Sequence, residues 1–258
     1  MRGGWPGTCK TCRNCKVFIV TESMHVITRE ALQDDALQRM VAAGAPNMRI
    51  LTEAERAASL AATLAQRPHE CDGDGVWLFA YGSLIWNPAL HFDQRRLARV
   101  HGWHRSFCLS TQAGRGTPAN PGLVLGLDRG GACTGAAFHV PEALMADELA
   151  LLWRREMLSG SYQPRWVRVR GADRAPFGHA IAFTIHRSCE HYAGGLARED
   201  VVRRLSSACG ALGSSADYLF HTRDGLRSLG ITDKGIEDLA QRVERACAPS
   251  TPHPAVAI

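Results

Sequence analysis

The sequence contains no apolar stretch long enough to cross a membrane. A membrane-spanning helix needs roughly 20 consecutive apolar residues, and no run in the 258 residues approaches that length. The N-terminal segment, MRGGWPGTCKTCRNCKVFIV, also lacks the apolar stretch that follows the charges of a secretory signal. These absences predict a soluble cytoplasmic protein with no membrane partner.

Lysine is scarce, with three residues against 27 arginines, and the formal net charge is +5. The arginines are spread along the chain and interleaved with acids, as in Arg154-Arg155-Glu156. A nucleic-acid-binding protein concentrates basic and stacking aromatic residues on one surface, and the sequence shows no such cluster. We therefore expect a solvated arginine surface and no nucleic-acid partner. Apolar residues make up 45% of the chain, which is enough for a substantial core.

The nine cysteines do not form a complete metal site. The spacing Cys9-x-x-Cys12-x-x-Cys15 suits zinc or an iron–sulfur cluster, but a fourth ligand at a matching distance is missing. We expect no metal there. Residues 1–23 are interpreted as a flexible leader, upstream of a natural start at Met24. The remaining cysteines are isolated, mostly among apolar neighbours, and are expected to be reduced thiols: Cys71, Cys108, Cys133, Cys189, Cys209 and Cys247.

Helical patterns flank a region rich in short apolar runs. Thr52 and Glu55 form a capping box that predicts a helix ending near Pro68. From residue 76 the sequence changes to β-type runs bounded by turn residues. These runs cover residues 76–80, 97–103, 105–111, 123–127, 133–140, 165–170 and 179–186.

One helix is predicted inside this region and three after it. Pro141 begins a helical segment that extends to residue 158. Residues 198–247 read as three helices, with breaks near Gly213 and Gly230. Strands with one inserted helix and a helical cover indicate an α+β fold. We expect four parts: a leader at 1–23, a helical extension and linker at 24–75, one domain at 76–248, and a loose tail at 249–258.

Three segments carry residues suited to chemistry. After the first strand, Tyr81-Gly82-Ser83-Leu84 forms a Gly-Ser turn whose N–H groups and hydroxyl suit a carboxylate. Taken alone, the motif is better explained as a β-turn with aromatic packing. Glu156 lies among Trp153 and Met157, and burial there would raise its pKa toward that of a general base. A surface ion pair with a neighbouring arginine is the alternative.

The third segment, residues 111–122, is a Gly-rich loop with two prolines. It leads into a strand and so lacks the helix N-terminus that binds a pyrophosphate. Arg115 in this loop remains a candidate partner for an anion.

Three other groups of potentially reactive residues are better explained by structural roles. Ser83 is not in a G-x-S-x-G nucleophile elbow. His101 and His104 flank a strand turn and do not look like a metal pair. Nothing local supports a dyad of Cys108 with a histidine. All are expected to be structural.

Four of these motifs together are specific for one protein family, although each motif alone is a weak signal. YGSLIWNP, GRGTPANPG, WRREMLSGSY and ADYLF occur in this order, and together they resemble the ChaC family of glutathione-specific γ-glutamylcyclotransferases. The similarity extends from about Met24 to about Cys247. It implies a small β-barrel with helices around its rim, no metal and no cofactor.

The resemblance also implies roles for individual residues. Glu156 matches the family's acid/base, and the YGSL turn matches the segment that binds the glutamyl moiety. The loop arginine of the family corresponds to Arg115. This chain reads SGSY where eukaryotic members have a shorter GGY. The substrate-binding residues implied are Tyr81, Gly82, Ser83, Leu84, Arg115, Tyr162 and Tyr218.

The implied reaction is cyclisation of the γ-glutamyl group of glutathione to 5-oxoproline, with release of Cys-Gly. Broad-specificity relatives carry an asparagine after the YGS turn, whereas this chain has Leu84. Arg115 offers a cation for the second carboxylate of glutathione. Two alternatives remain open: a broader cyclotransferase for γ-glutamyl amines or γ-glutamyl amino acids, and a non-catalytic binding module on the same barrel.

Overall fold

The computed structural model describes residues 26–69, 75–171 and 175–248. The predicted leader with its three spaced cysteines, most of the linker before residue 75 and the tail from residue 249 lie outside these residues.

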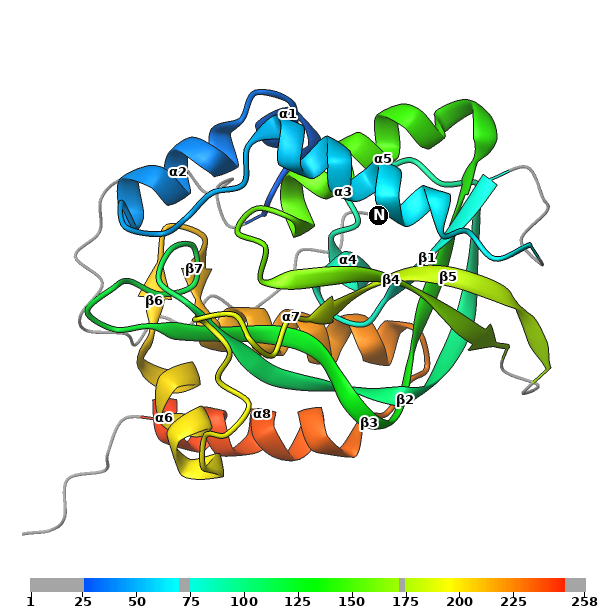
Figure 1. Ribbon diagram of the computed structural model, residues 1–258. Helices are drawn as coiled ribbons and strands as arrows, with labels where there is room; N and C mark the ends of the chain where they lie inside the picture. The colour runs from blue at the N-terminus through cyan, green and yellow to red at the C-terminus, as the bar shows by residue number, and fades with distance from the viewer. Residues whose placement is uncertain (1–25, 70–74, 172–174, 249–258) are drawn as a thin grey trace, which may run out of the picture.

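Within the described residues, five strands close a barrel in the order β1-β3-β2-β4-β5. Most neighbouring strands are antiparallel, whereas β5 lies parallel to β1 and to β3. Figure 1 shows the barrel between two groups of helices. The strands are β1 (Gly75–Ala80), β2 (Gln94–Thr111), β3 (Gly122–Pro141), β4 (Tyr162–Arg170) and β5 (Pro176–Ile185).

The long hairpin of β2 and β3 corrects the prediction of four short strands. The two strands pair from Gln94 opposite His139 to Thr111 opposite Gly122. The ladder continues through His104, where the two predicted runs were separated, and its register shifts between His101 and Trp103 and between Phe107 and Leu109. Gly102 adopts a φ of +80°, a value that glycine reaches without a steric penalty. A bulge therefore bends the strand at this point without ending it.

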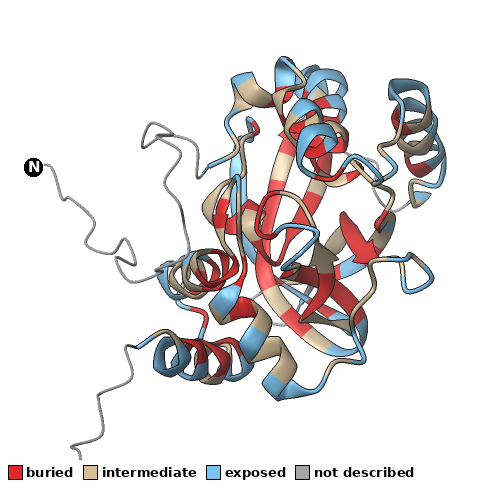
Figure 2. Ribbon diagram, turned by 90° about the vertical axis from the view of Figure 1, so that its left-hand side faces the viewer, coloured by how far each residue is buried: buried red, intermediate tan, exposed pale blue. Residues whose placement is uncertain are grey.

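The barrel interior is the main core. Leu123, Leu125 and Leu127 alternate along β3 and are 0%, 1% and 0% exposed, as expected for one face of a strand. Burying a leucine fully contributes about 1.5–3 kcal/mol relative to leaving it exposed. Figure 2 shows the buried segments concentrated along the strands and on the inner faces of the helices.

The N-terminal helices pack over one side of the barrel. They are α1 (Arg29–Gln33), α2 (Ala36–Gly44) and α3 (Glu53–Ala65). The predicted capping box is confirmed: the Thr52 hydroxyl accepts from the Glu55 amide at 3.2 Å, and Glu55 accepts from the Thr52 amide at 2.8 Å. The Trp153 indole donates to Ser59 and the Trp166 indole to the Thr63 carbonyl, so α3 is held against the barrel side.

Two helices connect the strands. The short helix α4 (Ser83–Trp86) follows β1, and α5 (Glu142–Glu156) follows β3, where the inserted helix was predicted. Arg29 of α1 donates to both oxygens of Glu148 of α5, at 2.6 and 2.7 Å. The N-terminal helices are thereby tied to the inserted helix.

The predicted three C-terminal helices are confirmed. They are α6 (Arg198–Ser207), α7 (Ser215–Ser228) and α8 (Lys234–Cys247), with the short strands β6 (Cys209–Gly210) and β7 (Gly213–Ser214) between the first two. They pack on one another, on the side away from α1–α3 (Figure 1). No helix in the described ranges is long and apolar enough to span a membrane.

Candidate active site

The turn after β1 places polar groups against the end of the barrel. Tyr81 and Gly82 follow the last residue of β1, and Ser83 begins α4. A Cβ on Gly82 would lie 3.1 Å from the hydroxyl of Tyr218 and 3.3 Å from the side chain of Leu125. The close approach of these side chains to the turn therefore favours glycine at this position.

Glu156, the last residue of α5, points into the same region. Its side chain is 12% exposed. Burial raises the pKa of Glu156, and the guanidinium of Arg155, with Nε at 3.1 Å from the carboxylate, opposes the rise. Glu156 is therefore largely buried, as one interpretation expected, and it pairs with an arginine on its own helix, but this ion pair does not lie on the surface as the alternative expected.

Arg155 is a functional candidate that the sequence reasoning missed, since the arginines of this helix were expected on a solvated surface. Its side chain is 4% exposed. It donates from Nη2 to the Ser83 hydroxyl at 3.0 Å and from Nη1 to the Asn87 carbonyl at 2.6 Å. The signal was present: Arg155 follows the apolar residues Leu151 and Leu152 by four and three positions, so it shares their helix face.

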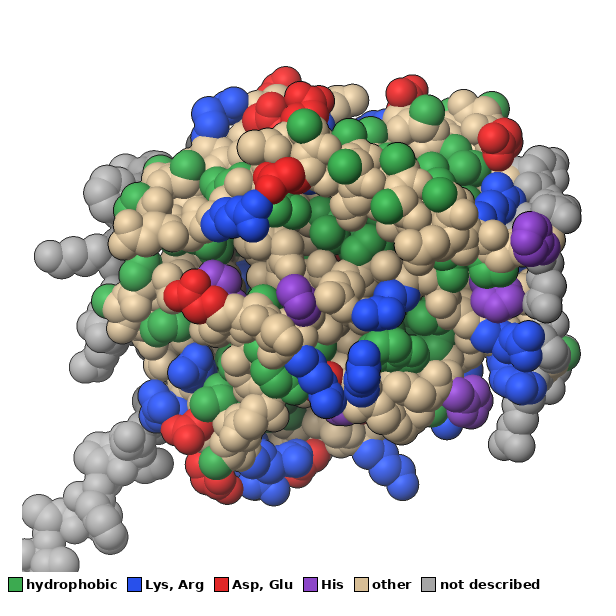
Figure 3. All heavy atoms as spheres, viewed as in Figure 1, with side chains coloured by type: hydrophobic (Ala, Val, Ile, Leu, Met, Phe, Trp, Pro, Cys, Tyr) green, Lys and Arg blue, Asp and Glu red, His purple; other side chains and the backbone are tan. Residues whose placement is uncertain are grey.

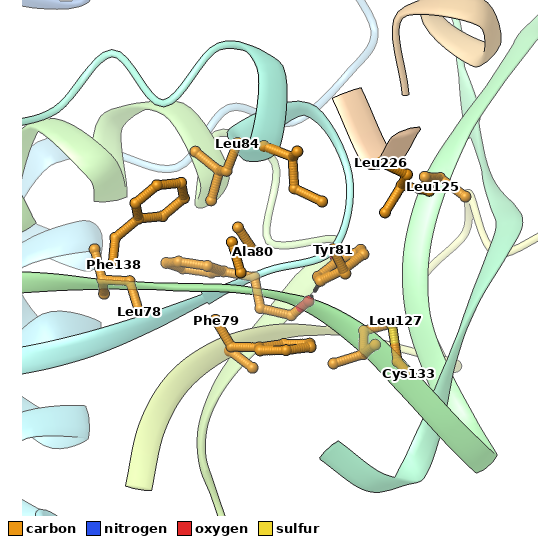
Figure 4. Close-up of a cluster of buried hydrophobic side chains, with 14 of the residues drawn as sticks. Leu78, Phe79, Ala80, Tyr81, Leu84, Leu125, Leu127, Cys133, Phe138 and Leu226 are labelled. Carbon is orange, nitrogen blue, oxygen red and sulfur yellow. Dashed lines mark hydrogen bonds between the residues drawn. The ribbon is translucent and has the colours of Figure 1, made fainter. Parts of the chain in front are cut away.

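Three tyrosines surround the carboxylate. The hydroxyl of Tyr81 donates to the Phe183 carbonyl at 2.7 Å, and that of Tyr162 to the Leu125 carbonyl at 2.6 Å. Burial raises the pKa of each of these tyrosines and of Tyr218. They therefore stay neutral near pH 7. Figure 4 shows Tyr81 extending from the end of β1 into the hydrophobic cluster.

A cavity of about 20 Å³ lies between these groups. That volume is close to the space one water molecule needs, so a glutamyl group would have to displace lining side chains to enter. The structure brings together all but one of the predicted site residues. Those that line the cavity are Tyr81, Gly82, Ser83, Leu84, Glu156, Tyr162 and Tyr218, with Leu125 and Phe183.

Arg115 is the predicted site residue that does not line this cavity. It is 6% exposed, its guanidinium lies 5.9 Å from the ring centroid of Tyr218, and it donates to the Ser214 carbonyl at 3.5 Å. Burial lowers its pKa, and Asp217 acts in the opposite direction. Arg115 therefore contacts the site through Tyr218.

Cys108, His101 and His104, which were expected to have structural roles, lie in different surroundings. Cys108 is fully buried, and burial raises its pKa to about 12, so the thiol is not activated as a nucleophile. His104 bonds to the Gly130 carbonyl at 3.1 Å, and His101 is exposed. Within the described ranges, no three His, Cys, Asp or Glu side chains gather as a metal site would require.

The fold is that of γ-glutamylcyclotransferases. A crystal structure of a γ-glutamylcyclotransferase specific to glutathione from yeast aligns with a TM-score of 0.62 at 20% identity, and covers 67% of this chain and 97% of the yeast chain.

The sequence comparisons define the family. The model of the ChaC-like protein family matches residues 76–246, and the chain belongs to this family. The glutathione-specific γ-glutamylcyclotransferase of Escherichia coli K12 is 41% identical over 228 residues, which are 88% of this chain and 96% of the relative. The human glutathione-specific γ-glutamylcyclotransferase 1 is 29% identical over 172 residues, which are 64% of this chain and 77% of the relative.

Proposed function

We propose that this protein cleaves glutathione by cyclising its γ-glutamyl group, giving 5-oxoproline and Cys-Gly. The observation that carries the proposal is the buried carboxylate of Glu156 beside the turn at Tyr81–Leu84, in one cavity with Tyr162 and Tyr218. The substrate is suggested by relatives named for glutathione, one of them 41% identical to this chain. The free thiols among the described cysteines fit a reducing compartment, and we propose a cytoplasmic location.

The substrate supplies its own nucleophile. The α-amino nitrogen of the glutamyl group attacks the γ-carbonyl carbon, a C–N bond forms within a five-membered ring, and the bond to the cysteine nitrogen breaks. The protein must hold amine and carbonyl together, which is an orientation task. It must also move one proton from the attacking nitrogen to the leaving nitrogen.

Glu156 is proposed as the proton carrier. Its raised pKa makes it a stronger base than an exposed glutamate while it is ionised. It takes the proton of the attacking amine and returns the proton to the departing amide nitrogen. Among the residues described, Glu156 is the only carboxylate in the cavity lining, and the tyrosine hydroxyls around it are neutral.

The turn at residues 81–84 is proposed to bind the glutamyl α-carboxylate. The first amides of a helix have no partners within the helix, and Ser83 begins α4. The Ser83 hydroxyl is held by Arg155, so it stays oriented toward the cavity. Ser83 acts as a hydrogen-bonding group in this scheme, and the enzyme forms no covalent intermediate.

Selection of glutathione must come from the part of the site that meets Cys-Gly, because every γ-glutamyl amide with a free amine can undergo the same cyclisation. Leu84 lines the cavity at the position where broad-specificity relatives have asparagine. We propose that glutathione is cleaved far better than γ-glutamyl-alanine. Equal kcat/KM for the two compounds would assign the protein to the broader class of cyclotransferases.

The test is release of 5-oxoproline from glutathione by the purified protein. Glu156→Gln should lower kcat by at least about 100-fold, the usual contribution of a general base. Glu142→Gln is the matched control, since Glu142 is exposed in the first turn of the same helix. Full activity of a folded Glu156→Gln protein would remove Glu156 from the mechanism, and no 5-oxoproline from the wild type would favour a non-catalytic binding module.

A further inference from the structure

One arginine of β2 is buried close to the turn that follows β1. The side chain of Arg105 is 4% exposed, and that of its partner Asp233 is 27% exposed. Figure 3 shows basic and acidic side chains next to one another over α6 and α8, where exposed pairs such as Arg198 with Asp238 lie. Exposed pairs contribute little to stability, whereas a buried guanidinium is costly unless it is paired and hydrogen-bonded. The contacts of Arg105 must therefore offset its burial.

The guanidinium of Arg105 joins three segments of the fold. Its Nε donates to the carbonyl of Tyr81 at 2.9 Å, and its Nη2 donates to the Thr134 carbonyl in β3. Its Nη1 pairs with the carboxylate of Asp233, the N-cap residue of α8. The other oxygen of this carboxylate accepts from two amides of the first turn of α8, at 3.0 and 3.2 Å. One side chain thus connects the turn after β1 to β3 and to the N-terminus of α8.

The carbonyl that Arg105 holds belongs to the peptide between Tyr81 and Gly82. The pairing of β1 with β3 ends at Ala80, so this peptide lies just beyond the ladder. Gly82 adds backbone freedom because it has no Cβ. A trans peptide is planar, and its C=O and N–H groups point in opposite directions. Fixing the carbonyl on Arg105 therefore also fixes the direction of the Gly82 amide.

The Gly82 amide belongs to the turn that we assign to the glutamyl α-carboxylate. Gly82 lines the cavity at Glu156, whereas Arg105 does not. Strand β2 reaches the same cavity two residues later, since the ring of Phe107 packs edge-on against that of Tyr218 at a centroid distance of 6.0 Å. A hydrogen bond to a peptide carbonyl polarises the peptide and strengthens its N–H as a donor. Arg105 is thus placed to act on the anion site without contacting the substrate.

We propose that Arg105, held by Asp233, is a positioning residue that directs the Gly82 amide toward the α-carboxylate of the γ-glutamyl substrate. The identity of the substrate rests on the proposed function, whereas the hydrogen bonds that carry the inference do not. Lysine has the charge of arginine but not its planar fork, so it cannot hold three acceptors on separate segments. The α-carboxylate takes no part in the proton transfers assigned to Glu156. Loss of this positioning should therefore weaken binding more than chemistry.

The first experiment measures kcat and KM of Arg105→Lys with glutathione and with γ-glutamyl-alanine. KM for glutathione should rise about tenfold, as expected for a weakened hydrogen bond to a charged group, and kcat should fall less. The value of kcat/KM should fall by the same factor for both compounds, because both carry the same α-carboxylate. A variant that merely folds less completely would instead show a lower kcat at an unchanged KM, since fewer molecules would be active.

Asp233→Asn tests the same connection in a variant that keeps the helix cap. Asparagine is as good as aspartate at a helix N-cap, but its NH2 group would set a donor against Nη1 of Arg105. KM should rise, by less than in Arg105→Lys. Arg227→Met is the matched control, because Arg227 binds Glu237 in the first turn of α8 with two bonds, at 2.7 and 2.6 Å. That pair joins α8 to α7 and not to the turn after β1, so KM should not change.

A second readout needs no catalysis. Amide hydrogen exchange over residues 81–86 in the substrate-free protein reports how firmly the turn is held. Exchange there should become faster in Arg105→Lys and in Asp233→Asn and stay unchanged in Arg227→Met. If the wild type releases no 5-oxoproline, the proposed function fails, while this measurement still decides whether Arg105 holds the turn.

Three results would overturn the proposal. The first is an unchanged KM in folded, active Arg105→Lys and Asp233→Asn proteins, and the second is exchange over residues 81–86 as slow in both variants as in the wild type. The third is a rise of KM in Arg227→Met as large as in Arg105→Lys, because loosening α8 alone would then explain the effect. A loss of kcat/KM confined to glutathione would move the action of Arg105 to the Cys-Gly end and would equally reject its action through Gly82.

Discussion

Replacing Arg155 by methionine tests what the positive charge next to Glu156 contributes to stability and activity. Methionine keeps much of the side-chain length but removes three interactions: the ion pair with Glu156 and the hydrogen bonds to Ser83 and to the Asn87 carbonyl. Hydrogen bonds from a charged group contribute about 1.5–3 kcal/mol each, and breaking a buried ion pair costs about 3–5 kcal/mol. These figures overlap, so we expect a loss of about 3–5 kcal/mol in the free energy of unfolding.

The pH dependence of activity should also change in this variant, and the contacts of Glu156 determine the direction of the change. Burial raises the pKa of Glu156, and Arg155 opposes that rise. Without the cation the pKa rises further, so ionised Glu156 is lost at a higher pH as the solution is acidified. The acidic limb of the kcat/KM profile should therefore move to higher pH in Arg155→Met, and activity should recover in part under alkaline conditions.

Urea unfolding and 5-oxoproline release across a pH series measure the two effects. Arg155→Lys is the matched variant, because it keeps a cation near Glu156 but lacks the planar fork that reaches Ser83 and Asn87 together. It should restore the position of the acidic limb more than the stability. An acidic limb that stays in place in Arg155→Met, or a stability loss below about 1 kcal/mol, would refute the reasoning.

Further predictions follow from contacts outside the cavity. Arg29→Met leaves Glu148, whose side chain is 2% exposed, without its arginine, and should lower the free energy of unfolding by about 3 kcal/mol in urea titrations. Burial acts to raise the pKa of Glu148, but Arg29 together with the backbone amide of His91 outweighs this effect, and the pKa is lowered. The pair therefore stabilises the fold above the pKa of the unfolded carboxyl, and this stabilisation is lost as the pH falls. Arg29→Met should accordingly lose less stability on acidification than the wild type does. An equal loss in the two proteins would contradict this. Arg115→Ala should lower kcat/KM about tenfold for both glutathione and γ-glutamyl-alanine, because Arg115 acts through Tyr218. A loss confined to glutathione would place Arg115 at the Cys-Gly end, as its loop motif implies.

Local sequence signals predicted most of the helices correctly. The capping box at Thr52 and Glu55 and the breaks near Gly213 and Gly230 rest on interactions within a few residues of each other. Such signals are readable because helix ends must satisfy their own backbone groups. The strands were predicted less well. The sequence pattern divided β2 at residue 104, whereas pairing with β3 carries the strand through this position and through a bulge at Gly102.

The motifs in the sequence determined by themselves the family, the barrel and most of the residues that line the cavity at Glu156, but not Leu125, Phe183 or the neighbouring Arg155. They did not determine which charges would be buried. Arg155 contacts Ser83 from 72 residues away, and the like-charged pair of Arg99 and Arg170 exists only because β2 and β4 meet. The exposure and charge environment of a side chain depend on partners that the chain brings together only on folding. Only the tertiary structure could therefore decide that one arginine of a charged helix end is buried against the catalytic candidate and that Arg99 and Arg170 lie opposite each other.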